Sequence, residues 1–157
     1  MSRAAIVELQ PYKLTKDDWV EQEVLFEDPG ILYHCDYVGD QYDDNERQQY
    51  IREELPKFFY GIADVDPETE TIKFYSKEKI LDSIKKELDG AISFIRRNAD
   101  LGDCTFYNLR YAGRWFRRDY TIFWSELASY TSAQFIENCI YCAEQTMYIG
   151  AIYSYHI

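Results

Sequence analysis

The chain has 157 residues, of which 46% are hydrophobic and 17% aromatic, and this composition excludes a disordered chain. Its net charge is −11, and residues 17–70 alone hold 17 acidic side chains against three basic ones. Phosphate contacts need Lys and Arg side chains, so we do not expect the acidic half to bind nucleic acid directly.

Short strands and short helices alternate in the first half of the chain. Strands are predicted where β-branched and aromatic residues cluster, and helices where apolar residues recur every three or four positions. In chain order these elements are a strand at 4–9, a helix at 16–26, a strand at 31–38, a helix at 46–55 and hairpin strands at 58–65 and 71–75. Thr15 and Asp18 have the spacing of a helix cap, and Pro56 is predicted to end the helix before it.

The second half begins with the longest predicted helix, at 77–98, which Ser76 caps and whose apolar residues follow a helical stripe. A second hairpin is predicted from strands at 104–111 and 114–124. A helix at 132–144 and a strand at 147–155 complete the chain. The absence of a regular strand–helix–strand repeat argues against a parallel α/β fold.

This element pattern predicts an α+β fold in a single domain spanning residues 1–157. The sheet is expected to be mostly antiparallel, built from the two hairpins plus the N- and C-terminal strands, with three to four helices packed on one face. No Pro-, Gly- or Ser-rich linker divides the chain. An exposed edge strand at 147–157 would allow two copies to pair, so a homodimer is left open.

The N-terminal residues and the cysteines indicate the cellular compartment of the protein. The first ten residues lack the apolar run of a signal peptide, and no stretch has the apolar length of a membrane span. The four cysteines, with no secretory signal, favour reduced thiols over disulfides. We therefore expect a cytoplasmic protein without a membrane partner.

Catalytic motifs are missing from the sequence, and only two histidines are available for acid–base chemistry. His34 and Asp36 would share one face of the predicted strand at 31–38, where the carboxylate could orient the imidazole or both could bind a metal. A solvated pair at a strand edge explains the same spacing. We expect no cofactor and, on balance, no enzyme.

Two cysteines, Cys139 and Cys142, form a CxxC motif that is typical of zinc or redox sites when it lies in a loop. Here the motif falls within a predicted helix, with Cys139 on its apolar stripe. The pattern therefore favours small buried hydrophobic residues, and we expect no metal.

A basic, aromatic segment lies around the turn of the second predicted hairpin. Its arginines and tryptophan could hold an anionic ligand, which would make the protein a small enzyme or ligand-binding module. They could equally neutralise the acidic half of the same molecule. The residues concerned are Arg110, Arg114, Trp115, Arg117 and Arg118.

Acidic residues interleaved with aromatic ones between positions 17 and 54 predict a docking surface for a basic partner. Carboxylates steer association and occupy Arg and Lys sites that otherwise hold phosphates, and rings supply buried anchors. The predicted partner-binding residues are Asp17, Asp18, Trp19, Glu21, Glu23, Asp43, Asp44, Glu46, Tyr50, Glu53 and Glu54.

The hypothesis that follows is a non-enzymatic protein that inhibits a basic, nucleic-acid-handling protein, such as a nuclease, by acting as a nucleic-acid mimic. In size and charge the chain is similar to the small acidic inhibitors of phages and of toxin–immunity systems, although no motif identifies a family. The anion-binding module is the alternative.

Overall fold

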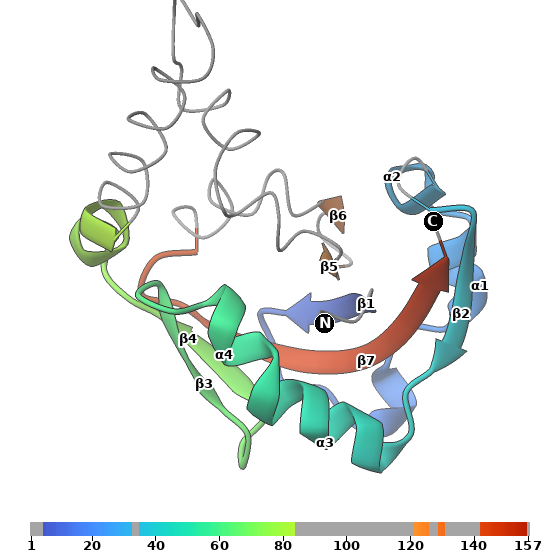
Figure 1. Ribbon diagram of the computed structural model, residues 1–157, viewed down its shortest axis with the longest axis horizontal. Helices are drawn as coiled ribbons and strands as arrows, with labels where there is room; N and C mark the ends of the chain where they lie inside the picture. Colours follow the sequence, from blue (N-terminus) through green and yellow to red (C-terminus); the bar gives the residue numbers. More distant parts are fainter. Residues whose placement is uncertain (1–4, 33–34, 84–120, 126–128, 131–141, 157) are drawn as a thin grey trace, which may run out of the picture.

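The computed structural model describes residues 5–32, 35–83, 121–125, 129–130 and 142–156 (Figure 1). These residues form a mixed sheet with the strand order β3-β4-β7-β1-β5-β6, and β2 also pairs with β7. The longest strand, β7 (Thr146–His156), curves through the middle of the sheet. The other strands are β1 (Ala5–Gln10), β2 (Tyr37–Gln41), β3 (Ala63–Asp66), β4 (Thr71–Phe74), β5 (Thr121–Trp124) and β6 (Ser129–Tyr130).

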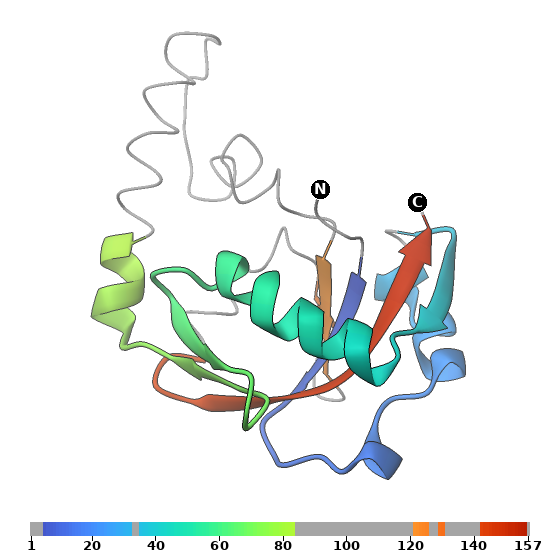
Figure 2. The same cartoon turned by 60° about the horizontal axis from the view of Figure 1, so that its bottom comes forward.

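Helices lie on both faces of this sheet (Figure 2). On one face pack α3 (Asp44–Glu53), α4 (Leu55–Phe58) and a helical segment at 77–83. The 3-10 turn η1 (Lys16–Asp18), α1 (Gln22–Phe26) and α2 (Pro29–Leu32) precede β2, and α1 and α2 contribute to the opposite face. Across the described ranges, no helix combines the length and apolar character needed to cross a bilayer.

The predicted fold is wrong in two respects, the pairing of one strand and the placement of the helices. The sheet is mixed, because β1 runs parallel to β5 in a register from Ala5 opposite Thr121 to Glu8 opposite Trp124. Helices cover it on both faces rather than one, and β1 is buried along its whole length, with Ala5, Val7 and Leu9 in one core and Ile6 in the other. The hairpin of β3 and β4 is present, whereas the one predicted at 104–124 lies mostly outside the described residues.

Several element boundaries also differ from prediction. The strand expected at 31–38 is wrong, because Pro29 begins a helical turn and only Tyr37–Gln41 forms a strand. The helix expected at 16–26 is broken into η1 and α1, and Pro56 sits in the first turn of α4, where its missing N–H costs no hydrogen bond. The last strand is confirmed, but it lies inside the sheet, so pairing of two copies through it as an edge is wrong.

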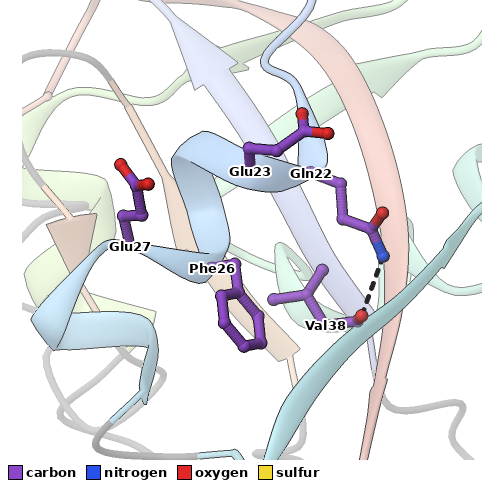
Figure 3. A pocket seen from close by; sticks show the side chains of 5 residues that line it. All are labelled: Gln22, Glu23, Phe26, Glu27 and Val38. Carbon is purple, nitrogen blue, oxygen red and sulfur yellow. Dashed lines mark hydrogen bonds between the residues drawn. The ribbon is translucent and has the colours of Figure 1, made fainter.

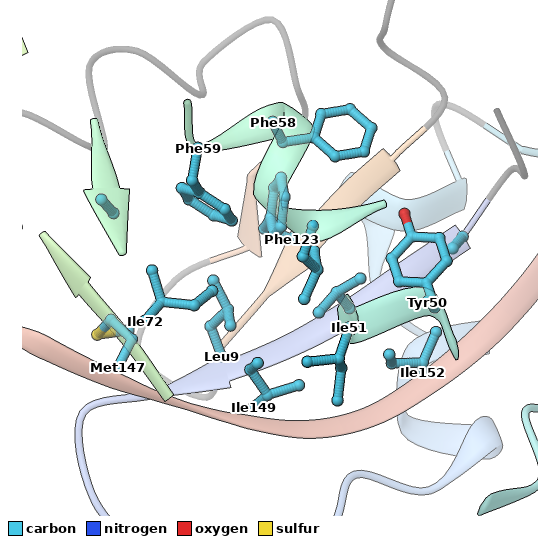
Figure 4. Packing of buried hydrophobic residues seen from close by; sticks show 14 of the residues in the cluster. Leu9, Tyr50, Ile51, Phe58, Phe59, Ile72, Phe123, Met147, Ile149 and Ile152 are labelled. Atoms are coloured by element: carbon cyan, nitrogen blue, oxygen red, sulfur yellow. The ribbon is translucent and has the colours of Figure 1, made fainter. Parts of the chain in front are cut away.

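The larger core fills the space between the sheet and α3 and α4 (Figure 4). Phe59 is buried in it, with its ring in edge-on contact with Phe123 at 5.5 Å and with Phe74 at 5.7 Å between ring centroids. Such edge-on aromatic pairs stabilise a core beyond the area they bury. The smaller core, on the other face, holds Ile6 and Leu25.

Tyr50 belongs to the larger core, and its hydroxyl shares a 2.8 Å hydrogen bond with the Thr121 hydroxyl. Burial raises the pKa of the Tyr50 phenol, an effect that the bond to Thr121 only partly offsets. The pKa is therefore higher in the folded than in the unfolded chain, where a tyrosine titrates near pH 10. The contribution of Tyr50 to the free energy of unfolding is therefore fully present below about pH 10, and it is lost as the pH rises towards the folded pKa.

Tyr50→Phe is expected to lower the free energy of unfolding by about 0.5–1.5 kcal/mol at neutral pH, because the hydrogen bond to Thr121 is lost. Above about pH 10 the difference should shrink, since phenylalanine has no proton to lose. Urea unfolding from neutral pH to about pH 11 measures both effects. A constant difference across that range would show that Tyr50 does not drive the alkaline loss.

A bulge interrupts the pairing of β1 and β7. Gly150 and Ala151 of β7 lie opposite the single residue Glu8, because Val7 pairs with Ile152 and Leu9 with Ile149. The Glu8 side chain is 1% exposed, and its Oε1 accepts hydrogen bonds from the Ala151 N–H at 3.0 Å and the Val20 N–H at 2.9 Å. The carboxylate thus supplies an acceptor for Ala151 where the bulge interrupts the ladder, and it also fastens Val20 to the sheet.

The other edge of β7 has a gap at the same bulge, because β4 pairs only up to Tyr148 and β2 only from Tyr153. Arg47 of α3, 3% exposed, fills it by donating from Nε to the Gly150 carbonyl and from Nη2 to the Ile149 carbonyl, both at 2.9 Å. Its Nη1 lies 2.6 Å from a carboxylate oxygen of Glu70. This arginine therefore joins α3 to the sheet where no strand can.

Candidate functional site

The acidic segments that flank β2 gather at one end of the sheet (Figures 1 and 2). Side-chain contacts link η1 to the start of α3, where Lys16 lies 3.4 Å from Asp44, and link α1 to β2 through Gln22. The segment before β2 is fastened to the sheet, because the Tyr153 hydroxyl donates to the Val20 carbonyl at 2.8 Å and Trp124 Nε1 to Asp28 at 2.9 Å. Several acidic segments are thus held side by side.

Some of the predicted docking carboxylates serve local structure instead. Asp18 accepts from the Thr15 hydroxyl at 2.8 Å and the Thr15 N–H at 3.2 Å, and these bonds, the hydroxyl first, lower the pKa of the Asp18 carboxyl. Asp43 and Glu46 cap α3 reciprocally, each side chain accepting from the backbone N–H of the other. These groups add negative charge to the surface, but their geometry is fixed by the caps.

Glu53 and Glu54 do not lie with the other acidic residues. Glu53 is the last residue of α3 and Glu54 its C-cap, about 14–15 Å along the helix axis from Asp44. Glu54 lies 3.7 Å from the Lys57 ammonium, and Glu53 accepts from Gln49. The predicted surface therefore divides into a main group near β2 and a separate pair at the far end of α3.

One of the two predicted aromatic anchors is buried. Tyr50 is 2% exposed, so its place on the surface is wrong, and Trp19 is half-buried with the Arg47 guanidinium 4.3 Å from its ring. The side chains that do reach solvent near the acidic group are Val24, Phe26 and Tyr37, at 47%, 49% and 51% exposure. Two of these carry rings, so aromatic contact area is available beside the carboxylates, from other residues than expected.

A surface hollow of about 270 Å³ lies between α1 and β2 (Figure 3). It is lined by Gln22, Glu23, Phe26, Glu27 and Val38. The Gln22 side chain closes one side of it, donating from Nε2 to the carbonyls of Val38 and Gly39, both at 2.9 Å. Phe26 turns towards Val38, while the two glutamates stand along the helix (Figure 3).

Asp36 lies near a different histidine from the one predicted. Its carboxylate is 3.5 Å from Nδ1 of His156, whose ring stacks on Tyr37 at 5.1 Å between centroids. His34 lies outside the described residues. Sequence reasoning missed His156 because only the pairing of β2 with the end of β7 brings it to Asp36. Both Asp36 and His156 are exposed, so the pair adds charge and a stacked ring to the surface.

The remaining candidates fall largely outside the described ranges. Cys139 lies there, and so do Arg110, Arg114, Trp115, Arg117 and Arg118, so the predicted anion site stays a prediction. Cys142 lies in a turn, half-buried, and burial raises the pKa of its thiol, which disfavours the thiolate that binds metal. Within the described part of the chain, no three His, Cys, Asp or Glu side chains come together as a metal site.

No protein-family model, curated protein or solved structure matches this chain. The function must therefore be argued from the arrangement of its own side chains. Among the described residues, the acidic group near β2, with its exposed rings and its hollow, is the strongest candidate site.

Proposed function

We propose that this protein is a non-enzymatic, cytoplasmic binding protein that docks on a basic, nucleic-acid-handling protein and inhibits it. One observation carries the proposal: exposed rings lie on the same elements as exposed carboxylates, Phe26 with Glu23 on α1, whose N-cap is Glu21, and Tyr37 beside Asp36 at the start of β2. Within the described ranges, no Lys or Arg side chain pairs with the carboxylate of Glu21 or Glu23. The surface thus has both parts that a docking site for a cationic protein needs.

The two parts have different physical roles. Exposed carboxylates contribute little affinity individually, but together they steer a positively charged partner and speed its association. Burial of aromatic anchors against the partner supplies most of the binding energy. The acidic group also influences the nearby Tyr153 phenol, whose pKa is raised by burial and further by charges including those of Glu21 and Glu23.

Inhibition of a nucleic-acid-handling protein is the biological outcome we propose for this chemistry. The Arg and Lys side chains that hold phosphates also form strong, charge-assisted hydrogen bonds with carboxylates. A rigid protein that presents carboxylates around aromatic rings would compete with nucleic acid for such a site. Phage inhibitors and immunity proteins are the kinds of protein that act in this way.

The test is capture of a partner from the basic proteins of the native host, followed by measured binding and inhibition. Complex formation should weaken at least tenfold between about 50 and 500 mM salt, because screening shortens the reach of exposed charges. The captured protein should lose its nuclease or nucleic-acid-binding activity at a one-to-one ratio. A partner that binds equally well at both salt concentrations would contradict the proposal.

Charge reversal locates the contact. Glu21→Lys with Asp40→Lys should weaken the complex by about tenfold to a hundredfold, mainly through slower association. The matched control is Glu53→Lys with Glu68→Lys, which changes the net charge equally on exposed side chains away from β2. Equal losses in both double variants would mean that only net charge matters and that the β2 end is not the docking site.

A further inference from the structure

The side chains that line the α1–β2 hollow offer hydrogen-bond acceptors and no donor. Gln22 uses both hydrogens of its amide nitrogen on the carbonyls of Val38 and Gly39, so only its Oε1 remains for a ligand. Glu23 and Glu27 are exposed and, when ionised, only accept. A ligand that fits this set must supply donors and carry positive charge.

The rest of the lining is apolar. Phe26 is half-exposed and Val38 is buried, and the two side chains lie next to each other under α1 (Figure 3). At about 270 Å³ the hollow is slightly smaller than the usual 300–1,000 Å³ of small-molecule sites. Its size and lining suit one long side chain with an apolar stem and a charged end.

We propose that this hollow receives a single arginine side chain of the basic partner. The guanidinium is flat, carries five N–H donors and no acceptor, and stacks on aromatic faces more readily than an ammonium does. Its stem would lie on Phe26 and its donors would face Glu23, Glu27 and the Gln22 oxygen. This inference rests on the proposed function, because the arginine belongs to the protein that is bound.

The experiment titrates ¹⁵N-labelled protein with N-acetyl-L-arginine methylamide and follows the amide signals by NMR. Saturable shifts are expected at the Gln22 side-chain amide and at the backbone of 22–27 and 38–39. The lysine analogue should bind at least about threefold more weakly, and the neutral glutamine analogue should cause no saturable shift. Shifts of equal size at all exposed carboxylates, or equal binding of the lysine analogue, would overturn the proposal.

Matched variants separate the hollow from general charge. Glu23→Gln with Glu27→Gln should weaken binding of the arginine probe about fivefold or more, and Phe26→Ala should also weaken it without any change in charge. Glu53→Gln with Glu68→Gln, which removes the same charge elsewhere, should leave the binding unchanged. If the last variant weakens binding as much as the first, the hollow is not the arginine site.

The two proposals fail in different ways. A salt-sensitive complex with a basic protein, combined with no localised arginine shifts, would reject the arginine site and leave the docking function standing. Localised arginine binding without any basic partner would instead leave the site and reject the docking function.

Discussion

Replacement of Arg47 by alanine should lower the free energy of unfolding by about 2–6 kcal/mol, because it leaves two main-chain carbonyls without their buried donor, at about 1–3 kcal/mol each. The Glu70 carboxylate would lose its guanidinium, and the carbonyls of Ile149 and Gly150 would lose their donors. Against a typical total stability of about 5–15 kcal/mol, this loss is large. Urea or thermal unfolding followed by circular dichroism measures it.

Two further variants identify the cause of the Arg47 effect. Arg47→Lys should recover only part of the loss, since an ammonium cannot donate in the fixed geometry that two carbonyls and one carboxylate require. Arg52→Ala is the matched control, because Arg52 forms an exposed pair with Glu68 at 2.7 Å and such pairs contribute about 0–1 kcal/mol. Full rescue by lysine would show that charge alone, without directed hydrogen bonds, holds α3 to the sheet.

Local sequence patterns correctly predicted the strands and turns that depend mainly on neighbouring residues in the chain. The strands at the two ends of the chain carry continuous β-forming runs, and Asp66 to Thr69 forms a hydrogen-bonded turn between β3 and β4. The parallel pairing of β1 with β5 joins residues more than a hundred positions apart, and no local pattern encodes it. At 31–38 the β-forming composition was overruled, because Ile31 is buried from a helical turn that Pro29 begins.

The candidate site was partly predictable for the same reason. The density of acidic residues correctly indicated a negative surface, since most of these side chains are exposed. The choice of Tyr50 as an anchor failed because exposure depends on which face of an element meets the core. Tyr50 follows the helical stripe of Ile51 and Leu55, a pattern that favours burial, whereas no pattern marked Phe26 as exposed. The hollow needs the packing of α1 on β2, which the sequence does not reveal.

The bulge in β7 connects the core to the candidate site, because it lies between the part of β7 that pairs with β4 and the part that pairs with β2. Arg47 holds it from one edge, and the buried Glu8 carboxylate holds it from the other. Loss of either contact should therefore also change the position of β2 and the shape of the hollow beside it. This coupling gives the second large prediction.

Gly150→Ala should lower the free energy of unfolding by about 2–6 kcal/mol, because a Cβ at this position would overlap the Glu8 carboxylate. The displaced carboxylate would leave the buried N–H groups of Val20 and Ala151 without their acceptor, at about 1–3 kcal/mol each. Denaturant unfolding measures the loss. Gly39→Ala is a control for glycine replacement elsewhere in the sheet, since its Cβ would mainly meet the movable Ser154 hydroxyl.

Glu8→Gln removes the charge of the buried carboxylate without changing the size of the side chain, so it separates the effect of charge from that of the steric overlap in Gly150→Ala. The new side-chain amide keeps one oxygen to accept from the two N–H groups. Its NH2 group would face the Gln10 amide, which can flip so that its oxygen accepts from the new amide and its nitrogen donates to the Ser125 hydroxyl. We therefore expect a smaller loss of unfolding free energy than for Gly150→Ala. Combined with Arg47→Ala, the Gly150→Ala change should cost less than the two separate losses together, because both act on one bulge. Strict additivity would mean that the two edges of β7 are held independently.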